Sequence, residues 1–131
     1  MKLVYPAIFT KDNETYDVVF PDLGNIQTYG DSIENAIYMA TDLASVWLLD
    51  MLEDGKDIPK STNIKDITVG EDSFVSLIRV DLEEYAKLTS RKVVKKNCTL
   101  PYWLEQQAEK RGYNFSRILQ EAILDKINNE V

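Results

Sequence analysis

The segment from Arg91 to Val131 is too short to bury a hydrophobic core of its own, and this restricts the folds open to the chain. Its composition predicts one β-strand over Val93–Leu100 and two short helices, over about Tyr102–Arg111 and Phe115–Asn128. Two copies of the segment could share a core by pairing their strands into a two-stranded antiparallel ribbon. We therefore expect a homodimer that forms through a domain spanning residues 89–131.

The helix signals in this segment agree with that layout. Pro101 can start the first helix, Gly112 can end it, and Asn114 is a good N-cap for the second helix. The second helix carries apolar residues at helical spacing, which would form one stripe. These residues are Ile118, Leu119, Ala122, Ile123 and Ile127. Such a stripe suits contact with a second copy.

Residues 1–88 predict a second domain that begins with strands. Strands are expected over Leu3–Phe9, Tyr16–Phe20 and Ile26–Tyr29, the first two joined by a polar loop of medium length. Pro6 in the first strand indicates a sheet edge or a bulge, because proline donates no backbone hydrogen bond.

A long amphipathic helix follows the third strand. Ser32 is a good N-cap, and Gly55 is a plausible C-terminal end. Lys56–Asp72 is expected to be a loop and Phe74–Val80 a fourth strand. A capping-box pattern at Asp81 begins a short helix to about Leu88, after which residues 89–92 form a hinge. Strands covered on one face by a helix predict an α+β fold of two layers.

Charge is distributed unevenly between the two predicted parts. Residues 1–90 contain seven Lys or Arg and 17 Asp or Glu, a net charge of −10. Residues 91–131 contain eight Lys or Arg and five Asp or Glu, a net charge of +3. This asymmetry suggests that the two parts have different partners.

Several classes of function are excluded by composition. The chain has no histidine, which excludes a His-based catalytic triad and His-containing metal sites. Cys98 is the only cysteine, so no disulfide can form within the chain. No apolar run is long enough for a membrane helix, and the first residues show no signal-peptide pattern. We expect a cytoplasmic protein without cofactor or catalytic residues.

The C-terminal layout resembles the ribbon-helix-helix repressors. The resemblance rests on Lys95 to Pro101, on Leu104 and Ala108, on Gly112 to Ser116, and on Leu119, Ala122 and Ile123. It implies that the paired strands enter the major groove of operator DNA and that alternate strand residues face the bases. Those residues here are Lys95, Asn97 and Thr99.

The register of this ribbon decides which side chains read DNA. With Lys95 and Asn97 outward, Cys98 points inward as a small core residue. Lys96 also points inward, where an apolar residue is usual, and a register shifted by one residue would exchange the two faces. The N-terminus of the last helix, at Asn114, Phe115 and Ser116, would hold a backbone phosphate through its free N–H groups.

The N-terminal part resembles the HicB antitoxins. The resemblance rests on the spacing of Tyr5 and Ala7, on Tyr16 to Leu23, and on Thr28 to Ala36, although the turn at Gly24 departs from the usual pattern. It implies a partial RNase H-like fold, a HicA-like toxin as partner, and repression of the toxin–antitoxin operon. The acidic charge of this part would complement a basic partner.

Four acidic residues near the predicted hairpin are candidates for toxin contact: Asp12, Glu14, Asp17 and Asp22. An RNase H-like fold also leaves an alternative open, a metal-dependent nuclease that uses Asp17 and Asp22, since such enzymes hold metal ions with clustered carboxylates. A dimer of dimers is a further possibility. The two tryptophans, Trp47 and Trp103, are interpreted as core or interface residues.

Overall fold

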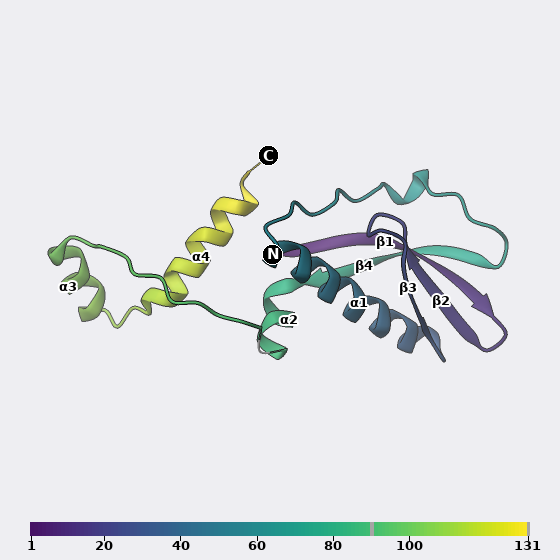
Figure 1. Cartoon of the computed structure of the whole chain (residues 1–131), viewed down its shortest axis with the longest axis horizontal. Coiled ribbons are helices and arrows are strands. Elements are labelled where there is room, and N and C mark those ends of the chain that lie inside the picture. Colours follow the sequence, from purple (N-terminus) through teal and green to yellow (C-terminus); the bar gives the residue numbers. More distant parts are fainter. Residues whose placement is uncertain (90, 131) are drawn as a thin grey trace. The chain divides into compact units, whose positions relative to one another are not determined.

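The computed structural model describes residues 1–89 and 91–130 (Figure 1). Two compact units divide the chain, one made of Lys2–Ser90 and the other of Arg91–Val131. Each unit is described by itself. Across the described ranges, no helix is both long enough and apolar enough to cross a membrane.

The N-terminal unit is built on a four-stranded antiparallel sheet. Its strands are β1 (Lys2–Asp12), β2 (Thr15–Phe20), β3 (Ile26–Gly30) and β4 (Ser73–Asp81), in the spatial order β3-β2-β1-β4. All four predicted strands are confirmed, with β1 extending further than expected. The last strand in sequence therefore pairs with the first, and the long connection between β3 and β4 contains the helix of this unit.

The hairpin between β1 and β2 is tighter than predicted. Asp12 pairs with Thr15, so the turn consists of Asn13 and Glu14 alone. Asn13 adopts a φ of 56°, in the left-handed region that asparagine tolerates better than most residues. The prediction of a medium-length loop is wrong because this residue lets strand pairing continue to the turn.

Pro6 lies in β1, which has β4 on one side along its length but β2 on the other side only from Ile8 onward. The N-terminal half of β1 pairs only with β4, because pairing with β2 begins at Ile8. One side of β1 is therefore open at Pro6, where the missing N–H is tolerated. The prediction of a sheet edge at this proline is confirmed locally.

Helix α1 (Ile33–Glu53) packs against one face of the sheet (Figure 1). The side chain of Ser32 accepts a hydrogen bond of 3.1 Å from the Asn35 N–H, as expected for the N-cap. Small residues of α1 face large apolar residues of the strands, which brings helix and sheet close together. The buried set comprises Ala36, Ala40, Ala44 and Leu48 on α1, and Tyr5, Phe9, Val18, Phe20, Ile78 and Val80 on the strands.

One glycine allows a close approach between this helix and the sheet, and a second glycine lies beside the helix residue Trp47. A Cβ atom on Gly30 would lie 2.3 Å from the backbone nitrogen of Ala36, so no other residue fits at the end of β3. A Cβ atom on Gly24 would lie 3.7 Å from the ring of Trp47, which is half-buried against the turn between β2 and β3. The interpretation of Trp47 as a core residue therefore agrees with its position.

A long connection leads from α1 to β4 (Figure 1). It contains one short 3-10 helix, η1 (Ile64–Asp66), inside the predicted loop. The Asp22 carboxylate holds the connection in place. It accepts hydrogen bonds from the Thr62 N–H, at 2.8 Å, and from the Thr62 hydroxyl. The Tyr5 hydroxyl donates to the carbonyl oxygen of Pro59. The connection is thus anchored at two points.

Helix α2 (Leu82–Leu88) follows β4 directly. The Asp81 side chain accepts a hydrogen bond of 3.2 Å from the Glu84 N–H, which confirms the predicted N-cap. Leu82 is buried and attaches α2 to the unit.

The C-terminal unit contains α3 (Tyr102–Lys110) and α4 (Phe115–Asn128), close to the predicted bounds. The residues from 91 to 100 form neither helix nor strand, so the strand predicted over Val93–Leu100 is absent from the single chain. A strand requires a neighbour for its backbone N–H and C=O groups, and the described residues of one chain supply none here. The predicted hinge at residues 89–92 includes Ser90, which lies outside the described residues.

Candidate nucleic-acid and protein interfaces

The extended segment that precedes α3 exposes both of its predicted faces. Lys95, Asn97 and Thr99, expected to read bases, are exposed. Lys96 and Cys98, expected to point inward, are exposed as well. The prediction that Cys98 is a buried core residue is therefore wrong for the single chain, because the layer that would cover it is missing.

An uncovered apolar surface runs over the two C-terminal helices. Neither α3 nor α4 has a single buried residue, and Trp103 is 67% exposed. A broad open groove of about 800 Å³ lies on this surface. The apolar residues that line it are Leu100, Trp103, Leu104, Ala108, Tyr113, Phe115 and Ile118. Continuous apolar surface of this kind marks a site of association.

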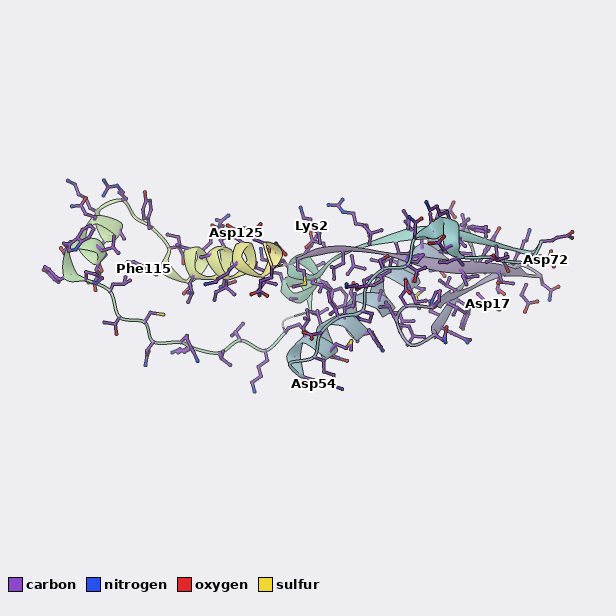
Figure 2. The ribbon with its side chains drawn as sticks, turned by 90° about the horizontal axis from the view of Figure 1, so that it is seen from above. Lys2, Asp17, Asp54, Asp72, Phe115 and Asp125 are labelled. Carbon is purple, nitrogen blue, oxygen red and sulfur yellow. The ribbon has the colours of Figure 1, made fainter. Side chains whose placement is uncertain are left out.

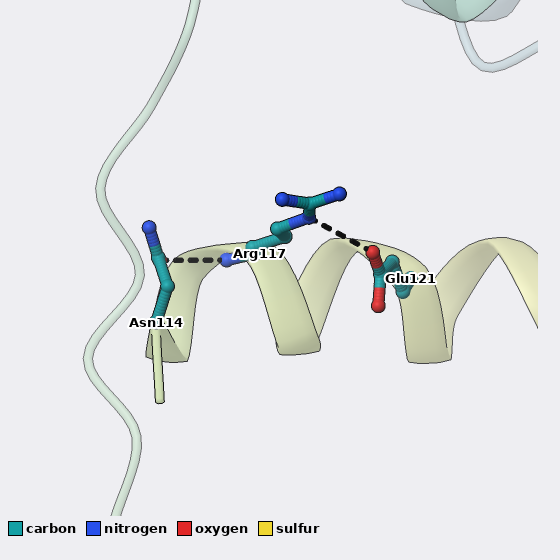
Figure 3. Close-up of polar contacts among 3 residues, drawn as sticks. All are labelled: Asn114, Arg117 and Glu121. Carbon is teal, nitrogen blue, oxygen red and sulfur yellow. Dashed lines mark hydrogen bonds and ion pairs between the residues drawn. The ribbon is translucent and has the colours of Figure 1, made fainter. Parts of the chain in front are cut away.

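The N-terminus of α4 has the geometry of an anion-binding site. The Asn114 side chain accepts a hydrogen bond of 3.0 Å from the Arg117 N–H, which confirms the predicted N-cap (Figure 3). The N–H groups of Phe115 and Ser116 have no acceptor within the helix, as in the first turn of any helix. Arg117 lies beside them and forms an exposed ion pair with Glu121, with 3.1 Å between Nε and Oε1. Such an exposed pair contributes little and is readily exchanged for another anion.

The four predicted toxin-contact acids do not form one cluster. Asp12 and Glu14 lie at the β1–β2 hairpin, whereas Asp22 lies past the other end of β2. A six-residue strand spans about 20 Å, which separates the two groups. Asp17 is exposed on β2, opposite Tyr29 of β3, and its side chain is labelled in Figure 2.

Asp22 has a structural role that sequence reasoning missed, since its carboxylate holds Thr62. Burial, and after it the charge of Asp22, raise the pKa of the Tyr5 hydroxyl. Among residues 1–89 and 91–130, no three His, Cys, Asp or Glu side chains gather where they could hold a metal ion. The nuclease alternative requires clustered carboxylates, whereas Asp17 lies on β2 and the Asp22 carboxylate binds Thr62.

A second groove, of about 460 Å³, lies inside the N-terminal unit, where α1, the end of β4 and α2 meet. We call it the α1–α2 groove. The residues that line it are Tyr38, Thr41, Asp42, Ser45, Arg79, Asp81, Glu84, Tyr85, Leu88 and Thr89. The Tyr85 hydroxyl donates a hydrogen bond of 3.0 Å to Asp42, which ties α2 to α1. The only sequence signal for this groove was the polar face of the long helix, and the pairing of that face with α2 was not predicted.

Comparison with known proteins decides the family. The family model of the HicB-like antitoxins of bacterial toxin–antitoxin systems matches residues 5–123. The chain belongs to this family. A HicB-like antitoxin is a component of a toxin–antitoxin system, and this membership favours a binding function over an enzymatic one.

Solved structures share the fold of this HicB-like antitoxin. A chain of a toxin–antitoxin complex from Streptococcus pneumoniae is 30% identical, with a TM-score of 0.63, and the match covers 96% of this chain and 99% of that one. The antitoxin HicB of Burkholderia pseudomallei is 20% identical, with a TM-score of 0.56 over 98% of this chain and 99% of that one. The α+β fold with a four-stranded antiparallel sheet is therefore the fold of known HicB antitoxins.

A phage protein is also similar to part of the chain. It is an uncharacterized 14.9 kDa protein from the rep-hol intergenic region of Haemophilus phage HP1, 34% identical over 83 residues. The match covers 61% of this chain and 62% of the phage protein.

Proposed function

We propose that this HicB-like antitoxin is a dimer with two separate binding activities. The acidic N-terminal unit, with a partial RNase H-like architecture, binds and neutralises a HicA-like toxin. The C-terminal unit, a ribbon-helix-helix domain, binds operator DNA and represses the toxin–antitoxin operon. The chain acts in the cytoplasm, by binding alone.

The observation that carries this proposal is the exposed apolar surface of the C-terminal unit. The apolar residues of α3 and α4 are exposed, and residues 92–100 before them form neither helix nor strand. Two copies could pair these segments as an antiparallel ribbon and cover each other's helices. The net charge of +3 in this part suits contact with phosphate.

The toxin half of the proposal is supported by the matching chain from the Streptococcus pneumoniae toxin–antitoxin complex. A chain of a HicA3 and HicB3 toxin–antitoxin complex also matches, with 20% identity and a TM-score of 0.50 over 60% of this chain and 99% of that one. The net charge of −10 in residues 1–90 complements a basic partner.

A gel-shift assay with operator DNA at physiological salt tests the DNA half. The double variant Lys95→Ala, Asn97→Ala should lose specific binding, by about 2–6 kcal/mol for two base contacts. The control variant Lys126→Ala, in the last turn of α4, removes a charge from the same unit and should bind nearly as wild type. Unchanged binding by the double variant would contradict the assignment of base contacts, and a monomeric wild-type chain would contradict the dimer.

A further inference from the structure

The α1–α2 groove combines three carboxylates from three different elements. Asp42 comes from α1, Asp81 from the end of β4, and Glu84 from α2. Arg79 is the one cationic residue among those that line this groove. The lining therefore carries an excess of negative charge, in a unit that is already strongly acidic.

Two of these carboxylates are held in position by hydrogen bonds. Asp42 accepts from the Tyr85 hydroxyl at 3.0 Å, and Asp81 accepts from the Glu84 N–H at 3.2 Å. An ionised carboxylate can accept about four hydrogen bonds, so both retain acceptor positions after these contacts. Fixed carboxylates with free acceptor positions favour a donor that carries several N–H groups, such as a guanidinium or an ammonium group.

Two side chains of the lining are largely apolar and well exposed. Tyr38 is 69% exposed, and Leu88, at the end of α2, is 77% exposed. The two side chains lie on the lining together with the carboxylates. Aliphatic stems of Lys and Arg pack against such apolar surfaces while their charged ends reach polar groups. The lining thus offers apolar surface for the stem of a Lys or Arg side chain and carboxylates for its charged end.

The same features argue against other occupants. A phosphate group, and therefore a nucleotide or a nucleic acid, would be repelled by the three carboxylates. Metal ions need at least three converging ligands, and the described part of the chain holds no such group. The excess of negative charge leaves a basic protein segment as the ligand that fits.

We propose that the α1–α2 groove is the docking site for an Arg- or Lys-bearing segment of the toxin. The charged end of one basic side chain binds Asp42, with Asp81 and Glu84 adding negative charge to the same lining, and its stem packs against Tyr38 and Leu88. This inference rests on the proposed function, and it relocates the toxin contact from Asp12, Glu14, Asp17 and Asp22 to a groove that those residues do not line.

Titration of the full-length chain with a purified HicA-like toxin tests the groove by calorimetry. The double variant Asp42→Asn, Glu84→Gln removes two charges and keeps the shapes of both side chains. We expect it to bind about tenfold more weakly or worse, with a smaller dependence on salt. The matched control Glu71→Gln, Asp72→Asn removes two exposed charges in the turn before β4, outside the lining of the groove, and should bind within about twofold of wild type. Circular dichroism verifies that each variant is folded.

The outcomes separate the two levels of the proposal. If the wild-type chain binds the toxin and the groove variant binds it equally well, the role of the groove is refuted but the proposed function is not. Equal weakening by both variants would also refute it, because long-range charge would then explain the loss. A wild-type chain that failed to bind the toxin would refute the proposed function and with it the role of the groove. A second variant, Tyr38→Ala, leaves every charge in place and should weaken binding if the stem packs as proposed.

Discussion

The two units of this HicB-like antitoxin differ in how their apolar residues are covered. The N-terminal unit buries Tyr5, Phe9, Phe20 and Leu48 between its sheet and α1. The C-terminal unit buries no residue of α3 or α4. The N-terminal unit therefore has a core within one chain, whereas α3 and α4 have none, and in our proposal a second copy covers them. The comparison separates the part of the chain with its own core from the part proposed to associate.

The largest effect is expected where the N-terminal unit is most tightly packed. Gly30→Ala places a Cβ atom 2.3 Å from the Ala36 backbone, and backbone cannot move aside as a flexible side chain can. The free energy of unfolding should fall by about 3 kcal/mol or more, measured by urea denaturation.

Gly70→Ala is the matched control for this change, because a Cβ atom there meets nothing within 4 Å. It should alter the free energy of unfolding by less than about 1 kcal/mol. A Gly30→Ala variant as stable as the control would show that the N-terminal unit is packed less closely than described.

The apolar stripe of α4 is the proposed contact between two copies of the C-terminal unit. Ile123→Asp puts a charge into its apolar stripe, where the side chain is half exposed in the single chain. The dimer should dissociate, with a loss of about 2 kcal/mol or more per copy, seen by light scattering as a halved mass.

Gln120→Asp, on the same helix, adds the same charge at an exposed position and should leave the dimer intact. If both variants dissociate, the added negative charge would explain the dissociation whatever its position on α4. No dissociation by either would mean that the stripe of α4 is not the dimer contact.

The smallest effect concerns the anchor between β1 and the long connection. Tyr5→Phe removes the hydrogen bond to the Pro59 carbonyl and should cost about 1 kcal/mol of unfolding free energy near pH 7. The raised pKa of Tyr5 means that the unfolded chain releases this proton first as the pH rises. Wild-type stability should therefore fall as the pH rises above about 10, the ordinary value for tyrosine.

The free energy of unfolding should fall less with rising pH in Tyr5→Phe than in wild type, as measured by denaturation at pH 7 and at high pH. Tyr29→Phe alters an exposed tyrosine and should change neither quantity appreciably. Parallel pH profiles for wild type and Tyr5→Phe would contradict the role of this hydroxyl.

Local signals in the sequence predicted most of the fold. Ser32 and Asn114 cap the helices that they were expected to cap, because an N-cap depends on contacts within one turn. The partnership of β1 with β4 could not be predicted, because residues far apart in sequence form it. The length of the β1–β2 loop was also predicted wrongly, for a local reason. Asn13 adopts a left-handed backbone conformation, which lets strand pairing continue to the turn.

The candidate sites followed the same rule. Lys95, Asn97 and Thr99 were proposed from a motif, and their orientation depends on a second strand that one chain lacks. Asp22 was chosen for its charge and proved to hold Thr62, forty residues away. The α1–α2 groove escaped prediction because Asp42 and Glu84 belong to helices that only the folded sheet brings together.

The pairing of β1 with β4 also sets an order of events during synthesis. Thr10 pairs with Ser73 and Lys2 with Asp81, so β1 leaves the ribosome well before β4 and stays open on that side until β4 has emerged. The hairpin of β1 and β2 closes over two residues and can form long before. When β4 arrives, it completes the sheet, and only α2 of this unit still has to follow. The four strands can thus pair before the C-terminal helices are free to associate.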